Sequence, residues 1–251
     1  MTFQDFNRAL LASTLLAGSA FFCGNAQAQQ TSEVGLGLGG LVYRGELAPQ
    51  YQLDNNRPAF TGFYRRDVTV PITVRGAFTA GLLRADDARV TDADGIVLPQ
   101  AAVRQARLSG WLTEVSVVAE YNFLNYHDRA DKYHYTPYLF AGVAGYYAST
   151  TTTTANPNLS QQLDQSGGMF GFAIPAGVGF KVALSEHLNL GLEVGARKLF
   201  TDQLDHLSQQ DPAYVNPHDP DWYFYNGVSL SYTFYKIRCP DQYKKNDRLL
   251  K

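Results

Sequence analysis

A repeated alternation of apolar and charged residues limits what this chain can fold into, and it is clearest in residues 188–200, LNLGLEVGARKLF. Successive side chains of a β-strand point to opposite sides, so Leu192 and Val194 lie on one face of this segment while Glu193 and Arg197 lie on the other. The strand therefore has one aliphatic face and one charged face, and the surrounding sequence must indicate which of them meets water.

Eight segments of the chain have this strand-like character, and turn-forming residues separate them. The connections between them alternate between long and short, which is the plan of a barrel with long external loops and short periplasmic turns. We therefore predict an all-β fold, an eight-stranded antiparallel up-and-down transmembrane β-barrel formed by residues 29–236. The predicted strands are 33–44, 58–66, 72–84, 109–122, 136–148, 170–183, 188–200 and 222–236, with residues 149–169 as a long loop.

The chemistry of the two faces distinguishes a membrane barrel from a soluble one. A soluble barrel that carries an apolar ligand needs its apolar face inside, whereas here the other face carries glycine, hydroxyls and charge in strand after strand. The apolar face is therefore expected to meet lipid, and the sheet must close because unpaired strand edges are costly in hydrocarbon. Side chains alone fill the interior of an eight-stranded barrel, which argues against an open pore or a large substrate cavity.

Residues 1–28 have the features of a signal peptide, with an apolar run over residues 9–22 and a small residue on each side of Gln27. Cys23 raises the alternative of a lipid anchor, but the bulky residues before it do not suit one. Export leaves Cys239 as the single thiol, so no internal disulfide is expected. The net charge of -2 gives no electrostatic reason to expect a nucleic-acid partner.

Charged residues on the polar face form the candidate site. Because buried charges persist when they are paired, we predict that Arg75 contacts Glu120 low in the barrel. Glu114, Glu193 and Arg197 are expected to form a second group higher up. Such a network can be a structural plug, which we favour, or a path for protons or ions. The predicted lumen network comprises Arg75, Glu114, Glu120, Lys181, Glu193 and Arg197.

Three short motifs are compatible with other chemistry. The glycines of GLGLGG, residues 35–40, match a dinucleotide-binding pattern, but no helix follows them. VTDADG, residues 90–95, lacks two oxygen ligands of a calcium loop. DHLS, residues 205–208, contains the residue types of a hydrolytic triad, too close together in sequence for triad geometry. We therefore expect no cofactor, no metal and no catalytic residue.

Four blocks of the sequence resemble the PorG-like outer-membrane barrels associated with type IX secretion. They are VGLGLGGLVYRGELAP, YTPYLFAGVAGYY, FAIPAGVGFKVALSEHLNLGLEVGARKLFTDQLD and DWYFYNGVSLSYTFYKIRCP. The resemblance implies a non-enzymatic barrel in the bacterial outer membrane that contacts periplasmic partners of the secretion apparatus. The family includes barrels of unassigned function, and no individual functional residue is carried over from it.

Two other functions remain open at this stage. The long loops suit a surface-exposed adhesion or binding barrel, and outer-membrane barrels that modify lipid or peptide also exist. The basic segment 237–251 is expected to be a periplasmic tail, either a partner-binding surface or simply solvated. The partners expected from the sequence are thus outer-membrane lipid and periplasmic proteins.

Overall fold

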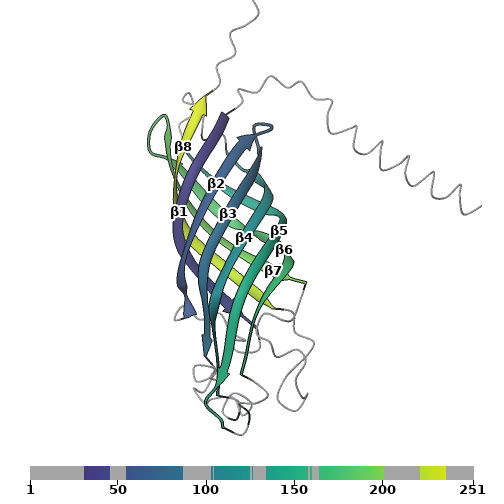
Figure 1. The fold of residues 1–251 in the computed structure, drawn as a ribbon. Coiled ribbons are helices and arrows are strands. Elements are labelled where there is room, and N and C mark those ends of the chain that lie inside the picture. The colour runs from purple at the N-terminus through teal and green to yellow at the C-terminus, as the bar shows by residue number, and fades with distance from the viewer. Residues whose placement is uncertain are drawn as a thin grey trace, which may run out of the picture.

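The chain forms a closed barrel in which each strand pairs antiparallel with its neighbours and β8 pairs with β1 (Figure 1). The strands are β1 (Thr31–Arg44), β2 (Arg57–Asp67), β3 (Ile72–Asp86), β4 (Ala106–Asn122), β5 (Tyr135–Thr154), β6 (Gln165–Ala183), β7 (Leu188–Leu199) and β8 (Trp222–Tyr235). This computed structural model describes residues 31–45, 55–86, 103, 105–124, 126, 134–157, 159, 164–200 and 221–235. The predicted eight-stranded up-and-down barrel is confirmed.

The structure corrects the predicted loop over residues 149–169. β5 continues through Thr154 and β6 begins at Gln165, so much of that segment is paired sheet. The pairing of Thr152 with both Leu108 and Gln165 shows the extension on both sides of β5. The threonine run forms strand because β-branched side chains fit the pleated surface of a sheet.

Two tight turns lie at the end of the barrel where β1 begins and β8 ends, the upper end in Figure 1. In the turn between β2 and β3, the amide of Val68 donates to the carbonyl of Ile72 at 2.9 Å. In the turn between β6 and β7, the amide of Leu184 donates to the carbonyl of Leu188 at 2.8 Å. We refer to this end as the turn end and to the opposite end as the loop end.

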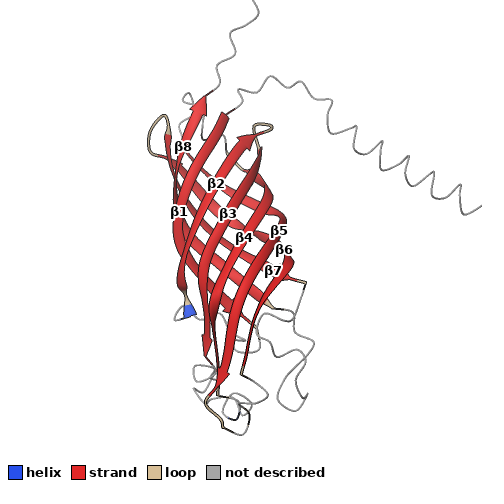
Figure 2. Ribbon diagram, viewed as in Figure 1, coloured by secondary structure: helices blue, strands red, loops and turns tan. Residues whose placement is uncertain are grey.

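Strands account for nearly all of the regular structure in the part of the chain that is described (Figure 2). Within that part, no helix has the length and apolar character needed to cross a membrane.

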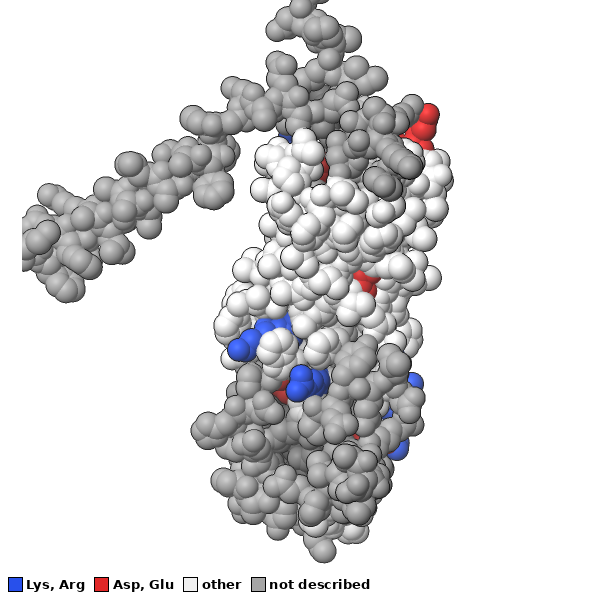
Figure 3. Space-filling view, turned by 180° about the vertical axis from the view of Figure 1, so that it is seen from behind, with Lys and Arg blue, Asp and Glu red and all other residues white. Residues whose placement is uncertain are grey.

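The exterior of the barrel is apolar between its two ends. Leu38 is 72% exposed, Val143 is 67% exposed and Val115 is 62% exposed, and each projects from the outer face of its strand. Figure 3 shows this band as a broad white region with one small red patch inside it. Aromatic residues gather near its borders, with Trp111 against Tyr147 toward the loop end at 5.4 Å between ring centroids. An apolar band bordered by aromatic girdles is the exterior of a transmembrane barrel in the outer membrane.

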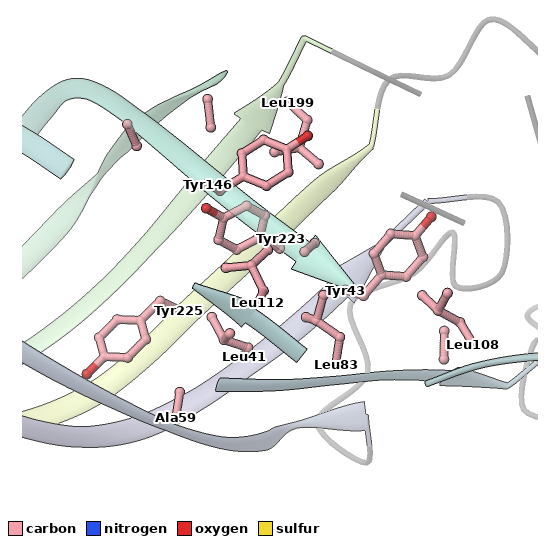
Figure 4. Close-up of a cluster of buried hydrophobic side chains, with 14 of the residues drawn as sticks. Leu41, Tyr43, Ala59, Leu83, Leu108, Leu112, Tyr146, Leu199, Tyr223 and Tyr225 are labelled. Carbon is pink, nitrogen blue, oxygen red and sulfur yellow. The ribbon is translucent and has the colours of Figure 1, made fainter. Parts of the chain in front are cut away.

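The interior has two layers of different chemistry. Toward the loop end, buried leucine and tyrosine side chains fill the lumen, among them Leu41, Tyr43, Leu112, Tyr146 and Tyr223 (Figure 4). Toward the turn end the lumen is filled by charged and hydroxyl side chains. The apolar layer is a feature that the alternation pattern did not predict, since that pattern suggested a polar lumen throughout.

Candidate functional site

All six charged residues predicted to face the lumen are buried there. Four strands supply them: β3 carries Arg75, β4 carries Glu114 and Glu120, β6 carries Lys181, and β7 carries Glu193 and Arg197. Their relative exposures range from 1% to 8%. The burial of all six side chains has the same cause: the alternation that directs their aliphatic neighbours outward directs these side chains into the lumen.

Glu120 lies at the centre of the network. Arg75 Nε lies 2.9 Å from Glu120 Oε1, at an angle that makes this contact an ion pair rather than a hydrogen bond. Arg65 Nε donates to the same oxygen at 3.1 Å, and Lys181 Nζ donates to Oε2 at 2.6 Å. The Glu120 carboxylate thus compensates part of the positive charge of Arg65, Arg75 and Lys181 in a buried site.

The structure joins the two groups that the sequence treats as separate. Arg75 also contacts Glu193, whose other oxygen lies 3.7 Å from Arg197 Nη2. Arg197 Nε in turn lies 3.4 Å from Glu114 Oε2. Arg75 is therefore the link between the lower and upper charges, because its long side chain reaches carboxylates from two different strands.

Two further members of the network, Arg65 and Glu33, were missed. Arg65 Nη1 lies 3.4 Å from Glu33 Oε2, which also accepts a hydrogen bond from Ser231 at 3.1 Å. Glu33 is two residues before Gly35, and the alternation places the glycines of this segment on the lumen face. Extending the same two-residue period from Gly35 toward the N-terminus would therefore have predicted that Glu33 faces the lumen. The network then holds four carboxylates and four cations, and it is electrically neutral.

The charged residues of the network are Glu33, Arg65, Arg75, Glu114, Glu120, Lys181, Glu193 and Arg197. Aromatic rings separate and cover these charges. Lys181 Nζ lies 4.5 Å from the ring centroid of Tyr138, and the Arg65 guanidinium lies 4.2 Å from that of Phe63. The Tyr138 hydroxyl donates to Glu193 at 3.0 Å. The hydrogen bond supplies a donor to Glu193, and the rings cover the cations with apolar surface.

Tyr126 covers the network at the turn end. It lies in the connection between β4 and β5, is 4% exposed and donates its hydroxyl to Glu33. Burial, together with the neighbouring Glu33 carboxylate, raises the pKa of Tyr126 well above its ordinary value. The hydroxyl therefore stays protonated and remains a donor to the carboxylate over the physiological pH range.

Two glycines leave the space that the large side chains fill. A Cβ built on Gly35 would lie 2.2 Å from the Phe63 ring, and one built on Gly179 would lie 2.3 Å from the Tyr138 ring. Within the GLGLGG segment, Gly35 thus leaves room for the Phe63 ring of the neighbouring strand β2. All six residues of the segment lie within strand β1 rather than at the start of the helix that a dinucleotide site requires.

The cavity described beside the charged network is small. A cavity of about 10 Å³ lies beside Arg75, Glu193 and Arg197, which is room for about one water molecule. Among the described residues, no three histidine, cysteine, aspartate or glutamate side chains are grouped so that they could hold a metal ion. The arrangement suits a filled, paired interior better than a site of bond-making chemistry.

Several predictions fall outside the described residues. They concern the signal peptide 1–28, the segments 90–95 and 205–208, Cys239 and the tail 237–251. The domain limits at 28/29 and 236/237 belong with them and stay predictions.

Solved outer-membrane barrels are similar to this chain in architecture. Ail, the attachment invasion locus protein of Yersinia pestis, is 13% identical, with a TM-score of 0.45 over 82% of this chain and 100% of that one. The outer membrane protein OprG of Pseudomonas aeruginosa is 11% identical, with a TM-score of 0.42 over 83% of this chain and 97% of that one. The outer membrane protease OmpT of Escherichia coli is 13% identical, with a TM-score of 0.39 over 83% of this chain and 98% of that one.

No curated protein matches the sequence. The sequence pattern of the family described as a domain of unknown function, DUF6089, matches residues 13–241. That match includes all eight strands of the barrel. The chain is therefore a member of the DUF6089 family.

Proposed function

We propose that this barrel is a non-enzymatic scaffold or accessory subunit of protein secretion in the outer membrane, and that it acts through its ends. The observation that carries the proposal is the filled lumen, in which a neutral ion-pair network and an apolar layer occupy successive levels. In the part of the barrel that the structure describes, these side chains occupy the lumen where a conduit for a substrate would run. The outer wall of the barrel faces lipid, so contact with other proteins falls to the two ends.

The turn end carries exposed apolar residues that strand pairing does not require. Val68 and Val70 are 56% and 62% exposed in the turn between β2 and β3, and Leu184 is 58% exposed in the turn between β6 and β7. Phe123, just after β4, is 54% exposed. Exposed apolar groups on a periplasmic surface are a basis for protein contact. The resemblance to PorG-like barrels suggests type IX secretion as the apparatus concerned.

The turn end can be tested in cells that secrete through this system. We expect the full-length protein to crosslink to a periplasmic secretion component, and Val68→Asn with Val70→Asn to reduce that crosslink several-fold. Val143→Asn, a change of the same kind on the lipid-facing wall, is the matched control and should leave the crosslink unchanged. Heat-modifiable migration on gels reports folding of each variant.

Deletion of the gene tests the secretion role itself. Loss of many secreted proteins from the medium supports the proposal. Normal secretion, together with the absence of any secretion component among crosslinked proteins, refutes it. Loss of surface adhesion alone would favour a binding barrel that acts through its long loops, and hydrolysis of lipid or peptide by the purified protein would favour an enzyme.

A further inference from the structure

Strand β6 begins farther toward the loop end than β7 reaches, so one edge of β6 has no neighbour there among the described strands. β6 begins at Gln165, but its pairing with β7 starts only where Ala173 lies opposite Leu199. On its other side, β6 pairs with β5 from Gln165 onward. In Figure 1, β5 also extends farther toward the loop end than β8 does. We call residues 166–172 of β6 the overhang.

The backbone of the overhang presents hydrogen-bonding groups on this open side. The amide of Phe200 donates to the carbonyl of Phe172 at 3.4 Å, which identifies the side of β6 that faces β7. Backbone groups of alternate residues point to the same side of an antiparallel strand, so the N–H and C=O groups of Gly168 and Phe170 point this way as well. In the described part of the chain, no strand pairs with them on that side. Their donors and acceptors repeat about every 7 Å, which is the spacing of an extended backbone.

The overhang lies beyond the lipid-facing wall. Ile174, just after the overhang, pairs with Lys198, whose charged side chain is exposed on the outer face of β7. Phe170 and Phe172 lie farther toward the loop end than this charge, and they are 66% and 64% exposed. An unpaired sheet edge is costly in hydrocarbon, which agrees with a position outside the membrane core. Long loops face outward in barrels of this plan, so the overhang is on the cell-surface side.

The overhang lacks the features that usually protect an exposed sheet edge. Natural sheets protect such edges with lysine, proline or a bulge. The sequence of the overhang is SGGMFGF, without a charged residue or a proline, and its register with β5 continues without a bulge. The rings of Phe170 and Phe172 contact each other at 5.4 Å between centroids and form an apolar surface beside the edge.

From this geometry we propose that the overhang binds an extended segment of a partner protein at the cell surface, which adds to the barrel as a strand in line with β7. The backbone of the segment pairs with Gly168 and Phe170, and its alternate apolar side chains pack on the two phenylalanine rings. A second copy of this chain does not fit. Antiparallel pairing of two such edges needs a two-fold axis perpendicular to the wall, which would invert one copy in the membrane. This inference is independent of the secretion role.

The test uses the purified full-length protein in lipid nanodiscs and a probe peptide of alternating valine and threonine with a lysine at each end. NMR follows amide hydrogen exchange at Gly168 and Phe170, and at Met169 and Gly171, whose amides point toward β5. Without peptide we expect fast exchange at the first pair and slow exchange at the second. The peptide should slow exchange at the first pair about five-fold or more, since one hydrogen bond contributes about a factor of that size. The same peptide methylated on every internal backbone nitrogen should have no effect.

Phe170→Pro and Phe170→Ala form a matched pair of variants. Both remove the ring, but only proline removes the N–H group that faces the open edge. We expect Phe170→Pro to bind the peptide about five-fold more weakly than Phe170→Ala does, because it loses one further hydrogen bond. Both variants should fold with equal yield, since proline is tolerated in a strand where its missing N–H would face solvent.

Occupation of the edge by this chain itself is the main alternative. Slow exchange at Gly168 and Phe170 without peptide, or a folding defect specific to Phe170→Pro, would show such occupation and overturn the proposal. Equal effects of the methylated and unmethylated peptides, or equal weakening in the two variants, would show adhesion to the phenylalanine rings alone and overturn it as well. Unchanged exchange in the presence of the peptide would show that the edge accepts no extended segment.

Discussion

Replacement of Glu120 by glutamine is the sharpest test of the interior network. Glutamine has nearly the same shape as glutamate, so the substitution removes one charge without opening a cavity. In the native protein the two carboxylate oxygens lie within 3.1 Å of nitrogen atoms of Arg65, Arg75 and Lys181. The variant leaves these cations with one compensating carboxylate fewer and points an amide donor at groups that are themselves donors.

The loss of stability expected for Glu120→Gln follows from the burial of Glu120, which is 1% exposed. Removing one partner of a buried ion pair typically costs about 3–5 kcal/mol, because the remaining charge is left uncompensated away from water. We expect Glu120→Gln to lower the free energy of unfolding by that amount. Adding Lys181→Met to this variant removes one unbalanced cation, so part of the loss should be regained.

Urea titration of the barrel in lipid vesicles, followed by tryptophan fluorescence, measures the free energy of unfolding. Glu186→Gln changes the same residue type on the exposed turn between β6 and β7, and it should stay within about 0.5 kcal/mol of the parent. A loss below about 1 kcal/mol for Glu120→Gln would refute the reasoning. If the double variant is less stable than Glu120→Gln alone, the argument that charge balance stabilises the network is refuted.

Three further predictions concern the seal, the packing and the wall. In planar bilayers we expect no steady conductance from the parent or from Arg75→Ala. The reason is that the apolar layer at the loop end closes the lumen independently of the charges. A steady current through the parent would contradict a filled barrel. Gly35→Val should slow folding and lower the stability of the barrel by about 1–3 kcal/mol through overpacking. Gly76→Ala should be tolerated, because a Cβ added at Gly76 meets no atom within 4 Å. Folding yields on gels compare the two variants. Leu38→Arg should lower the free energy of unfolding by about 2–4 kcal/mol in urea titrations in vesicles, because it places a charge in hydrocarbon. Thr151→Arg, on the extension of β5 toward the loop end, should leave the free energy of unfolding nearly unchanged.

The alternation of residues was sufficient to predict the number of strands, their order and the face that meets lipid. The period of a strand is two, so a single register assigns every side chain of β7 to the wall or to the lumen. Turn residues then set where each strand stops, as at the short connection before Leu188. The strand boundaries were least accurate where β5 and β6 continue into the threonine run, because hydroxyl residues suit both loops and exposed strands.

The pairing of the interior charges depended on closure of the barrel. Arg75 and Glu193 are separated by 118 positions and come from strands that are not neighbours, so neither periodicity nor spacing relates them. Long side chains meet across the lumen at positions set by the tilt and stagger of the closed sheet. For the same reason Arg65, on β2, reaches Glu120 on β4, although strand pairing alone would assign Glu120 to β3 and β5.

The sequence by itself determined that the chain is a barrel with an apolar wall and charges inside, because strand periodicity is a local property. Only the tertiary structure decided that those charges form one neutral network and that leucine and tyrosine side chains close the loop end. It also decided that Arg44, Trp222 and Lys198 stand side by side, since their strands β1, β8 and β7 become neighbours when the first and last strands pair. Contacts of this kind arise from closure, which no local pattern encodes.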